Sequence, residues 1–558
     1  MSLAGRIYGS IPRRYRRRSL AVAASIVAGA VLDLAGIATL IPLLLVIAKP
    51  GVVATSSTMR RLYEMSGFSD VGAFTLVLGC AAVVALVVKN ALTMFMADYQ
   101  TRYLTSLYRY FSDRLFASFY GRGLLYIKQK QSADLTYNVT SQCYTYVWGL
   151  LMPAVSMLGG GVIIAVMLII FFAVSAKAAG LLIVCIAPVV WLYVALVRRK
   201  VTEYGREDFA ARRGQMRQVL QAFRAYPEIE IAGAYPSIHD RLAANLEKVS
   251  HYRVRIERML RLPAGMMEAG IALCIALLLA ARPGNMLATL TIFGVASLRM
   301  LPAIRSLMGG WNAIRQNSHT MELVAELEQN RAQEAVAPRE VAFNRGIELR
   351  GVGFAYEDGG RRVIDDLSLT IARGERLAIK GPSGAGKSTL LNILLGFYPP
   401  DEGRVLIDGV ELDPSTRASW QRMVGYVPQE VYLVEGTLAE NVALGVEPAM
   451  IDKQKVLRVL RQVSLEAKVA SLADGADTPL GENGCRLSGG ERQRVGIARA
   501  LYKGAGVLVF DEATSALDKQ TESEIAASLT ALAGQMEGLT IIAVSHRDLP
   551  FCTRVITL

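Results

Sequence analysis

The stretch GPSGAGKST (381–389) decides the fold of the second half of this chain. The run ERLAIK (375–380) before it has the pattern of a strand, and TLLNILLGF after it has the pattern of a helix. The stretch fits G-x-x-x-x-G-K-[ST] at Gly381, Gly386, Lys387 and Ser388, and a strand, loop and helix in this order predict a phosphate-binding loop. Its glycines let backbone N–H groups turn toward the phosphates, Lys387 would reach the β- and γ-phosphates, and Ser388 would bind Mg²⁺.

A second expected strand, VLVFDE (507–512), ends in two carboxylates. Asp511 is suited to Mg²⁺, directly or through water. Glu512 is suited to polarising an attacking water next to the metal. An acidic pair alone would indicate a solvated turn, but behind a phosphate-binding loop it favours catalysis.

A third apolar strand, LTIIAVSH (539–546), ends in His546, one of only four histidines. A lone histidine usually has a structural role. This one ends a strand that we expect to run parallel to the other two, and parallel sheets bind ligands at their strand C-termini. His546 is therefore a candidate contact for the γ-phosphate.

The first half of the chain has a different composition. The length of 558 residues predicts two or more domains, and 52% of the residues are hydrophobic. The net charge of +13 fits either a nucleic-acid partner or a membrane protein with basic cytoplasmic segments. Because the basic N-terminus RIYGSIPRRYRRRSL (6–20) directly precedes an apolar run, we favour the membrane and expect no nucleic acid.

Six apolar runs are long enough to cross a bilayer, which needs about 20 residues. The basic N-terminus indicates the cytoplasmic side, which also places the Arg- and Lys-rich stretches 99–145 and 199–261 inside as extensions of the spans. Outside, residues 57–68 predict a short amphipathic helix, with a solvated loop as the alternative. The expected spans are 19–48, 73–98, 146–173, 178–198, 262–281 and 286–311.

These patterns predict two domains of different class. Residues 1–320 form an α-helical six-span transmembrane domain with cytoplasmic loops, and residues 321–345 form a polar linker. Residues 346–558 alternate short β runs with helical stretches, which predicts an α/β P-loop nucleotide-binding domain.

Together with LSGGERQR (487–494), these motifs resemble the nucleotide-binding domain of ATP-binding-cassette (ABC) transporters, and the whole chain resembles an exporter half-transporter. Tyr356 in FAYEDG matches the aromatic residue that stacks on adenine, Gln429 in YVPQE the Q-loop glutamine, Asp518 in SALD the D-loop and His546 the switch histidine. The resemblance implies three catalytic residues, Glu512, His546 and Gln429, and three ligands of Mg²⁺, Ser388, Gln429 and Asp511. It implies that the residues that bind ATP are Tyr356, Gly381, Ser383, Gly384, Gly386, Lys387, Ser388, Thr389, Ser488, Gly489, Gly490 and Asp518.

The resemblance also explains why one chain carries two phosphate-binding elements. In this family the LSGGE signature covers the ATP that a different cassette holds, so two cassettes form a head-to-tail dimer around two ATP molecules. No motif is degenerate, which favours a homodimer, with a heterodimer as the alternative. By the same analogy, cytoplasmic loops near 128–140 and 222–235 would carry cassette closure to the spans.

The membrane half gives a looser indication of the cargo. The runs 293–317 and 32–48 and the outer segment 57–68 resemble flippases of lipid-linked oligosaccharides of the PglK type. Charges inside spans are functional candidates, and Arg299 and Arg305, lined up in a cavity, would hold a pyrophosphate in steps. The alternatives are ion pairs, Arg299 with Glu268 or Lys89 with Asp33, or side chains that extend to the interface. The candidate cavity residues are Asp33, Lys89, Glu268, Arg299 and Arg305.

The favoured function is ATP-driven export or flipping of a lipid-linked pyrophosphate oligosaccharide, with peptide, lipid or drug export as the alternative. The apolar runs argue against a soluble cassette ATPase of DNA repair or translation, and Glu512 and His546 favour turnover over ATP-gated regulation. We expect a multi-pass protein of a bacterial cytoplasmic (inner) membrane, with its N-terminus and nucleotide-binding domain in the cytoplasm.

Overall fold

The computed structural model divides the chain into two compact units. Unit 1 comprises Met1–Gly121 and Gln129–Arg331, and unit 2 comprises Arg122–Lys128 and Ala332–Leu558. The structure describes residues 5, 9, 11–39, 43, 60–61, 63–64, 71–174, 176–281, 286–322, 327, 337–356, 362–481, 484–512, 519–535, 538–545, 549 and 551–558. Most of the expected linker and of the expected outer helix at 57–68 therefore lies outside the described residues.

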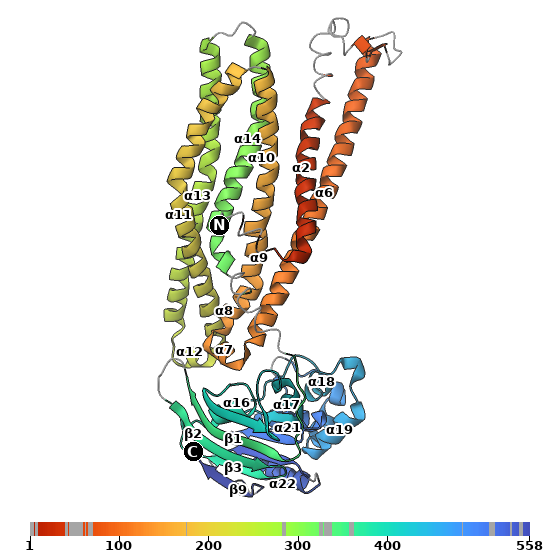
Figure 1. Cartoon of the computed structure of the whole chain (residues 1–558), viewed down its shortest axis with the longest axis vertical. Coiled ribbons are helices and arrows are strands. Elements are labelled where there is room, and N and C mark those ends of the chain that lie inside the picture. Colours follow the sequence, from red (N-terminus) through yellow and green to blue (C-terminus); the bar gives the residue numbers. More distant parts are fainter. Residues whose placement is uncertain are drawn as a thin grey trace. The chain divides into compact units, whose positions relative to one another are not determined.

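Unit 1 is built from long helices (Figure 1). Three of them, α6, α11 and α13, have 51, 49 and 47 residues. At about 1.5 Å per residue each is roughly 70 Å long or more, over twice the ~30 Å hydrocarbon thickness. These helices therefore continue beyond a membrane, as the polar stretches predicted. The long helices are α2 (Arg13–Ala38), α6 (Val71–Gly121), α10 (Met152–Val174), α11 (Ala176–Arg224), α13 (Tyr235–Ala281) and α14 (Met286–Gln316).

Among the described residues, four helical stretches are long and apolar enough to span a membrane. A shorter apolar stretch, Ile183–Val197, belongs to α11. Residues 282–285 and the side chains of 286–299 lie outside the description, so six spans stay a prediction. The four stretches are Arg13–Gly36, Gly72–Gly121, Ser132–Ile170 and Tyr235–Leu277.

Small residues let the helices of unit 1 approach closely. A Cβ atom on Gly160 of α10 would lie 3.0 Å from the carbonyl oxygen of Ala303 in α14, and one on Gly159 would lie 3.0 Å from Ile26 of α2. The run LGGG (158–161) thus allows close helix packing.

Short helical segments connect the long helices at the polar end of unit 1. Two of them, η1 and η2, are π-helical, a geometry that is frequent at functional sites. The segments are α8 (Ser132–Tyr137), η1 (Asn138–Gln142), α9 (Cys143–Tyr146), η2 (Val147–Leu151), α12 (Tyr226–Ile231) and η3 (Ser318–Thr320).

The helix α7 (Gly123–Gln129) lies almost entirely in unit 2 although both of its flanking segments belong to unit 1. Leu124 and Leu125 pack against the core of unit 2. The first loop that we expected to transmit cassette closure, near 128–140, overlaps the end of α7, and α12 lies within the second, 222–235.

Unit 2 contains two sheets. The order of the five-stranded sheet is β6-β7-β8-β3-β9, all parallel, and the order of the antiparallel sheet is β2-β1-β4-β5. Strands β3, β7 and β8 are adjacent, so the three strands that the sequence predicted share one edge at their C-termini. The strands are β1 (Gly346–Ala355), β2 (Arg362–Ala372), β3 (Arg376–Lys380), β4 (Glu402–Ile407), β5 (Val410–Glu411), β6 (Val424–Val427), β7 (Val507–Asp511), β8 (Thr540–Val544) and β9 (Arg554–Thr557).

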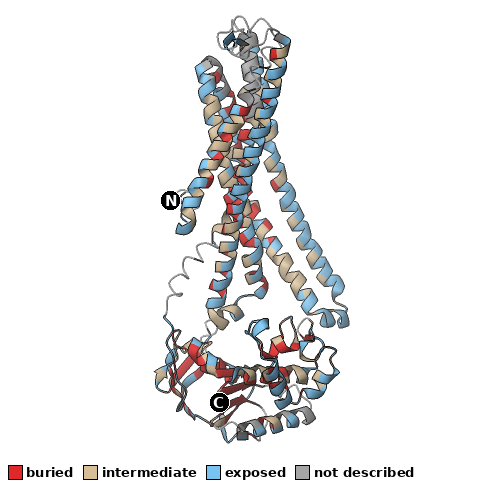
Figure 2. Ribbon diagram, turned by 90° about the vertical axis from the view of Figure 1, so that its right-hand side faces the viewer, coloured by how far each residue is buried: buried red, intermediate tan, exposed pale blue. Residues whose placement is uncertain are grey.

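Helices cover the parallel sheet, and the buried residues of unit 2 concentrate in its strands (Figure 2). Trp420 of α17 shows how the helices are held: its Nε1–H donates to the carbonyl oxygen of Leu394, 2.8 Å away, at the end of α16. The helices are α16 (Lys387–Leu394), α17 (Arg417–Met423), α18 (Leu438–Val442), α19 (Lys453–Gln462), α20 (Glu466–Ser471), α21 (Gly489–Lys503) and α22 (Lys519–Gln535), with the short turns η5 (Pro448–Met450) and η6 (Gly475–Asp477).

Candidate nucleotide-binding site

The predicted phosphate-binding loop lies between β3 and α16. Gly386 caps α16 with φ at 92°, and a Cβ atom there would lie 2.9 Å from the carbonyl oxygen of Val363, so this position requires glycine. The Nζ of the buried Lys387 donates to the carbonyl oxygens of Gly381 at 2.9 Å and Pro382 at 3.0 Å. The lysine therefore lies across the inside of the loop, where it would meet phosphate oxygens.

Two of the expected metal ligands are already adjacent. The Ser388 hydroxyl donates to Oδ1 of Asp511, 3.0 Å away. Burial raises the pKa of Asp511 above its usual range, partly offset by the bond from Ser388. A hydroxyl and a carboxylate beside a phosphate-binding loop fit Mg²⁺, which prefers oxygen ligands and neutralises the buried charge.

Glu512 follows β7 directly, and its φ of 48° is left-handed, unusual for a residue with a side chain. The strained backbone conformation of Glu512 therefore occurs within the candidate site, and backbone strain is often found at functional sites. Its Oε2 accepts from Nε2 of Gln429 at 3.2 Å, and its Oε1 lies 4.0 Å from Nζ of Lys387. The structure thus brings the expected catalytic glutamate, the Q-loop glutamine and the loop lysine into one network.

The expected adenine-stacking residue lies next to the phosphate-binding loop. The Tyr356 hydroxyl is 2.9 Å from Oγ1 of Thr389, and the residue is 39% exposed, which leaves room for a base. Tyr398 supports it, with ring centroids 6.2 Å apart, and burial raises the pKa of Tyr398 to about 12. No sequence pattern singled out Tyr398, because it follows α16 in an irregular turn.

The signature residues begin α21. Ser488 caps this helix: its hydroxyl accepts from the backbone N–H of Glu491 at 3.2 Å, and Glu491 accepts from the N–H of Ser488 at 2.7 Å. Ser488 and Gly489 are exposed, and a Cβ on Gly489 would meet nothing within 4 Å. The positive end of this helix dipole is therefore accessible to an anion.

The remaining predicted residues of the ATP site differ in exposure. Ser383 and Gly384 are exposed in the phosphate-binding loop, whereas Gly490 in the signature is half-buried. Asp518 and His546 lie outside the described residues.

The charged residues expected in the membrane half form ion pairs. Nζ of Lys89 lies 2.5 Å from a carboxylate oxygen of Asp33, the pair that the sequence offered as one alternative. Glu268 pairs with Arg305 at 2.5 Å, and the side chain of Arg299 is not described.

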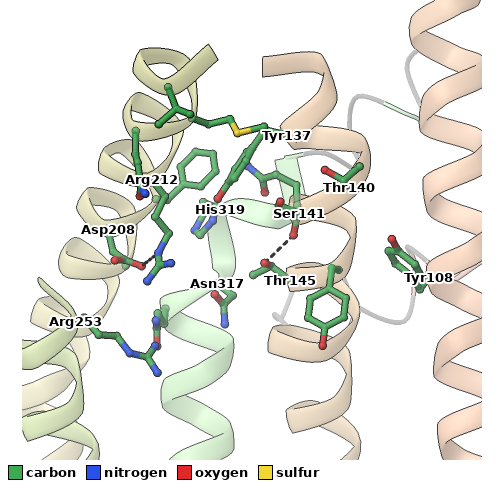
Figure 3. Close-up of a pocket in the computed structure, with 18 residues that line it drawn as sticks. Tyr108, Tyr137, Thr140, Ser141, Thr145, Asp208, Arg212, Arg253, Asn317 and His319 are labelled. Atoms are coloured by element: carbon green, nitrogen blue, oxygen red, sulfur yellow. Dashed lines mark hydrogen bonds and ion pairs between the residues drawn. The ribbon is translucent and has the colours of Figure 1, made fainter. Parts of the chain in front are cut away.

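The structure contains a polar cavity that the sequence did not indicate. It has a volume of about 1040 Å³ and lies in unit 1 between α11, the η1–α9 segment and η3 (Figure 3). Three buried acceptor or ring atoms at its wall have no hydrogen-bond partner among the described residues: Oε1 of Gln142, Oδ1 of Asp208 and Nδ1 of His319. Asp208 and Gln142 are each only 7% exposed. Of the five expected charged residues, the four whose side chains are described do not line this cavity.

Aromatic rings form another wall of the polar cavity. The centroid of Phe209 is 4.4 Å from that of His319 and 5.8 Å from that of Tyr137. Burial lowers the pKa of His319, so its imidazole is neutral near pH 7. The cavity therefore combines flat apolar faces with unsatisfied hydrogen-bonding atoms.

Comparison with known proteins places these features in a family. The model of the ABC transporter domain matches residues 364–515. An ATP-dependent lipid A-core flippase of Burkholderia pseudomallei is 30% identical over 518 residues, which cover 90% of this chain and 85% of the relative. This chain belongs to the ABC transporter family. A lipid A-core flippase of Cupriavidus metallidurans is 33% identical over 377 residues, 66% of this chain and 63% of the relative.

A solved bacterial Atm1-family ABC exporter with ATP bound has the same fold. The TM-score is 0.75 at 24% identity, and the match covers 96% of this chain and 91% of that one. The fold class predicted from the sequence, an apolar helical domain followed by an ABC nucleotide-binding domain, is confirmed. The ABC transporter binds ATP, couples its hydrolysis to transport, and combines membrane-embedded helices with a cytoplasmic ABC domain.

Proposed function

We propose that this ABC transporter flips a glycolipid, an amphiphile with hydrocarbon chains and a phosphorylated sugar headgroup. The polar cavity of unit 1 carries the proposal. The curated relatives are named for lipid A-core, and the lipid-linked pyrophosphate oligosaccharide favoured from the sequence has the same three chemical parts. Peptide, other lipid or drug export is the alternative.

The unsatisfied atoms of the polar cavity match a sugar. A buried acceptor without a donor costs free energy, and sugar hydroxyls would donate to Gln142 and Asp208. The C–H face of a sugar ring would pack on the Phe209 ring. Asp208 is already paired with Arg212 at 2.9 Å, so its charge is compensated and a neutral, hydroxyl-rich group fits better than a cation.

We propose that the functional transporter is a homodimer, with a heterodimer as the alternative. Two exposed surfaces of the chain support an assembly. The signature end of α21 is accessible to a second copy's ATP. In addition, the tip between α11 and α13 exposes apolar side chains that a second copy would cover: Phe223 is 76%, Tyr226 61% and Ile231 89% exposed.

In the proposed ATP site, Ser388, Gln429 and Asp511 would hold Mg²⁺, which supplies charge neutralisation at the β- and γ-phosphates. Glu512 would polarise the attacking water, and Gln429, which donates to it, would orient its carboxylate. Lys387 would bind the phosphates, Tyr356 the adenine, and His546 the γ-phosphate. Because the curated relatives are bacterial, we place the protein in a bacterial cytoplasmic membrane.

Transport in proteoliposomes tests the cargo. A labelled polyprenyl-pyrophosphate oligosaccharide and a labelled lipid A-core would be assayed separately in wild type, Glu512→Gln, Gln142→Leu and Gln221→Leu. Gln221 is the matched control, because it is exposed on α11 and does not line the cavity.

We expect ATP-dependent movement of one glycolipid in wild type and Gln221→Leu. Glu512→Gln should lose it, and Gln142→Leu should lose most of it while it retains ATP hydrolysis. Hydrolysis without movement of either glycolipid would refute the cargo and favour the alternative substrates. Undiminished transport by Gln142→Leu would remove the polar cavity from the pathway.

A further inference from the structure

A second cavity in unit 1 has a different chemistry from the polar one. It has a volume of about 540 Å³, within the range of roughly 300 to 1,000 Å³ typical of ligand pockets. Its walls come from α2, α6, α10 and α14, and nearly all of its lining side chains are apolar. Along α2 it extends from Ser19 to Ile26, and Ile11 also lines it. We refer to it as the apolar cavity.

The polar atoms of the apolar cavity have partners, with one exception. The hydroxyls of Ser19 and Tyr103 lie 2.5 Å apart and bond to each other. The indole Nε1–H of Trp311 is buried and finds no acceptor among the described residues. A buried donor without an acceptor costs free energy. The apolar cavity thus presents hydrocarbon walls, and the Trp311 ring is part of its lining.

A cluster of arginines begins α2, next to the end of the apolar cavity that Ile11 and Ser19 line. Five arginines precede Ser19 at the start of α2, and the first turn of this helix has no acidic residue. Nε of Arg16 donates at 3.3 Å to the carbonyl oxygen of Ile11, which itself lines the cavity. The Arg315 guanidinium lies 4.9 Å from the centroid of the Trp311 ring. The five arginines are Arg13, Arg14, Arg16, Arg17 and Arg18.

We infer that the apolar cavity binds one anionic diacyl phospholipid of the cytoplasmic leaflet. An acyl chain lies along the hydrocarbon walls and beside the Trp311 ring, and the phosphate lies among the arginines at the start of α2. Tryptophan is enriched at the depth of the interface, where ester groups lie, and basic segments beside a membrane attract anionic lipids. Each part of the lipid therefore meets the matching chemistry.

This lipid would bind in a different cavity from the proposed cargo, and it would have a structural effect on the helices around it. No residue is shared between the linings of the apolar and polar cavities. A lipid in the apolar cavity contacts α2 and α6 on one side and α10 and α14 on the other, so it would hold these two pairs together. The inference stands whether or not the cargo is a glycolipid.

Tryptophan fluorescence measures occupancy directly, because brominated acyl chains quench a nearby indole. The chain has four tryptophans: Trp148, Trp191, Trp311 and Trp420. Full-length protein in phosphatidylcholine nanodiscs would receive a small fraction of brominated phosphatidylglycerol or, separately, brominated phosphatidylcholine. The Trp311 signal is the difference between wild type and Trp311→Phe. Trp191 is the matched control, because it is 72% exposed on α11 and lies outside the apolar cavity.

We expect phosphatidylglycerol to quench Trp311 at least threefold more strongly than phosphatidylcholine, and both lipids to quench Trp191 equally. The preference should disappear in Arg17→Gln/Arg18→Gln. Ala154→Phe, which fills the cavity, should abolish quenching of Trp311. Equal quenching of Trp311 by the two lipids would identify an ordinary boundary lipid and overturn the inference. Absence of quenching in wild type would show that protein fills the cavity, which also overturns it.

A second measurement does not depend on the tryptophan variants. Native mass spectrometry of wild type purified with added phosphatidylglycerol should retain about one such lipid per chain, and Ala154→Phe should retain none. Retention of the labelled glycolipid in place of phosphatidylglycerol would assign the apolar cavity to the cargo and refute a resident phospholipid.

Discussion

Replacement of Gly205 with alanine should destabilise the helical unit. Gly205 is buried in α11, where the helix contacts the end of α14. A Cβ atom at this position would lie 2.4 Å from the carbonyl oxygen and 2.9 Å from the Cα of Gln316. Because these are backbone atoms, they cannot rotate away, and one helix has to move by about 1 Å to restore an ordinary carbon contact.

The expected free-energy change is the balance of two terms. Overpacking of this kind costs typically 1–3 kcal/mol, and contact with backbone places Gly205 near 3 kcal/mol. Alanine regains about 1 kcal/mol over glycine inside a helix. We therefore expect a net loss of about 2 kcal/mol. At roughly 2–4 °C per kcal/mol, the melting temperature should fall by about 4–8 °C.

Gly309→Ala is the matched control, since a Cβ on Gly309 of α14 would meet nothing within 4 Å. It should keep or raise the melting temperature. Both variants would be melted as full chains in one detergent at one scan rate, because unfolding of large membrane proteins is often irreversible. If Gly205→Ala melts at or above the wild-type temperature, α11 and α14 do not touch at Gly205 and the packing argument is wrong.

Three further outcomes concern unit 2. Glu512→Gln should still bind ATP but release phosphate about 10²–10⁴ times more slowly, and persistent release would indicate another base. Because burial raises the pKa of Asp511, its ionised form costs stability above the unfolded-state pKa of about 4. Asp511→Asn should therefore raise the melting temperature of nucleotide-free protein at pH 7, with a gain that vanishes toward pH 4; a gain that is constant with pH would contradict this. Trp420→Phe leaves the Leu394 carbonyl without its donor and should destabilise unit 2 by about 1–3 kcal/mol in denaturant unfolding, whereas an unchanged midpoint would show that the bond contributes nothing.

The nucleotide site could be predicted in detail because its chemistry is local. The glycine spacing around Gly386 and Lys387 forms a loop in any strand–loop–helix context. Asp511 and Ser388 then meet because β3 and β7 end at one edge of the same sheet. Tyr398 could not be predicted, since its contact with Tyr356 depends on where a turn places it after α16.

The membrane half was less predictable for a physical reason. Whether Glu268 meets Arg299 or Arg305 depends on the rotation and offset of α13 against α14, which hydropathy does not encode. The polar cavity depends on a π-helical turn at Asn138–Gln142, and nothing in the residues NVTSQ distinguishes that turn from an ordinary helix. The sequence did not predict that α7 belongs to unit 2, because the core on which it packs is distant in the sequence.

The placement of α7 also sets an order of events during synthesis. Leu124 and Leu125 pack on a core whose last strand, β9, ends at Thr557, so roughly 430 residues follow α7 before its partner is complete; at about 5–20 residues per second this takes some 20–90 seconds. The remaining expected spans are synthesised within that interval, before unit 2 is complete. Until then, Leu124 and Leu125 lack the core on which they pack in the finished protein. The half-buried α7 can therefore reach its final contacts only after the last strand of unit 2 has been synthesised.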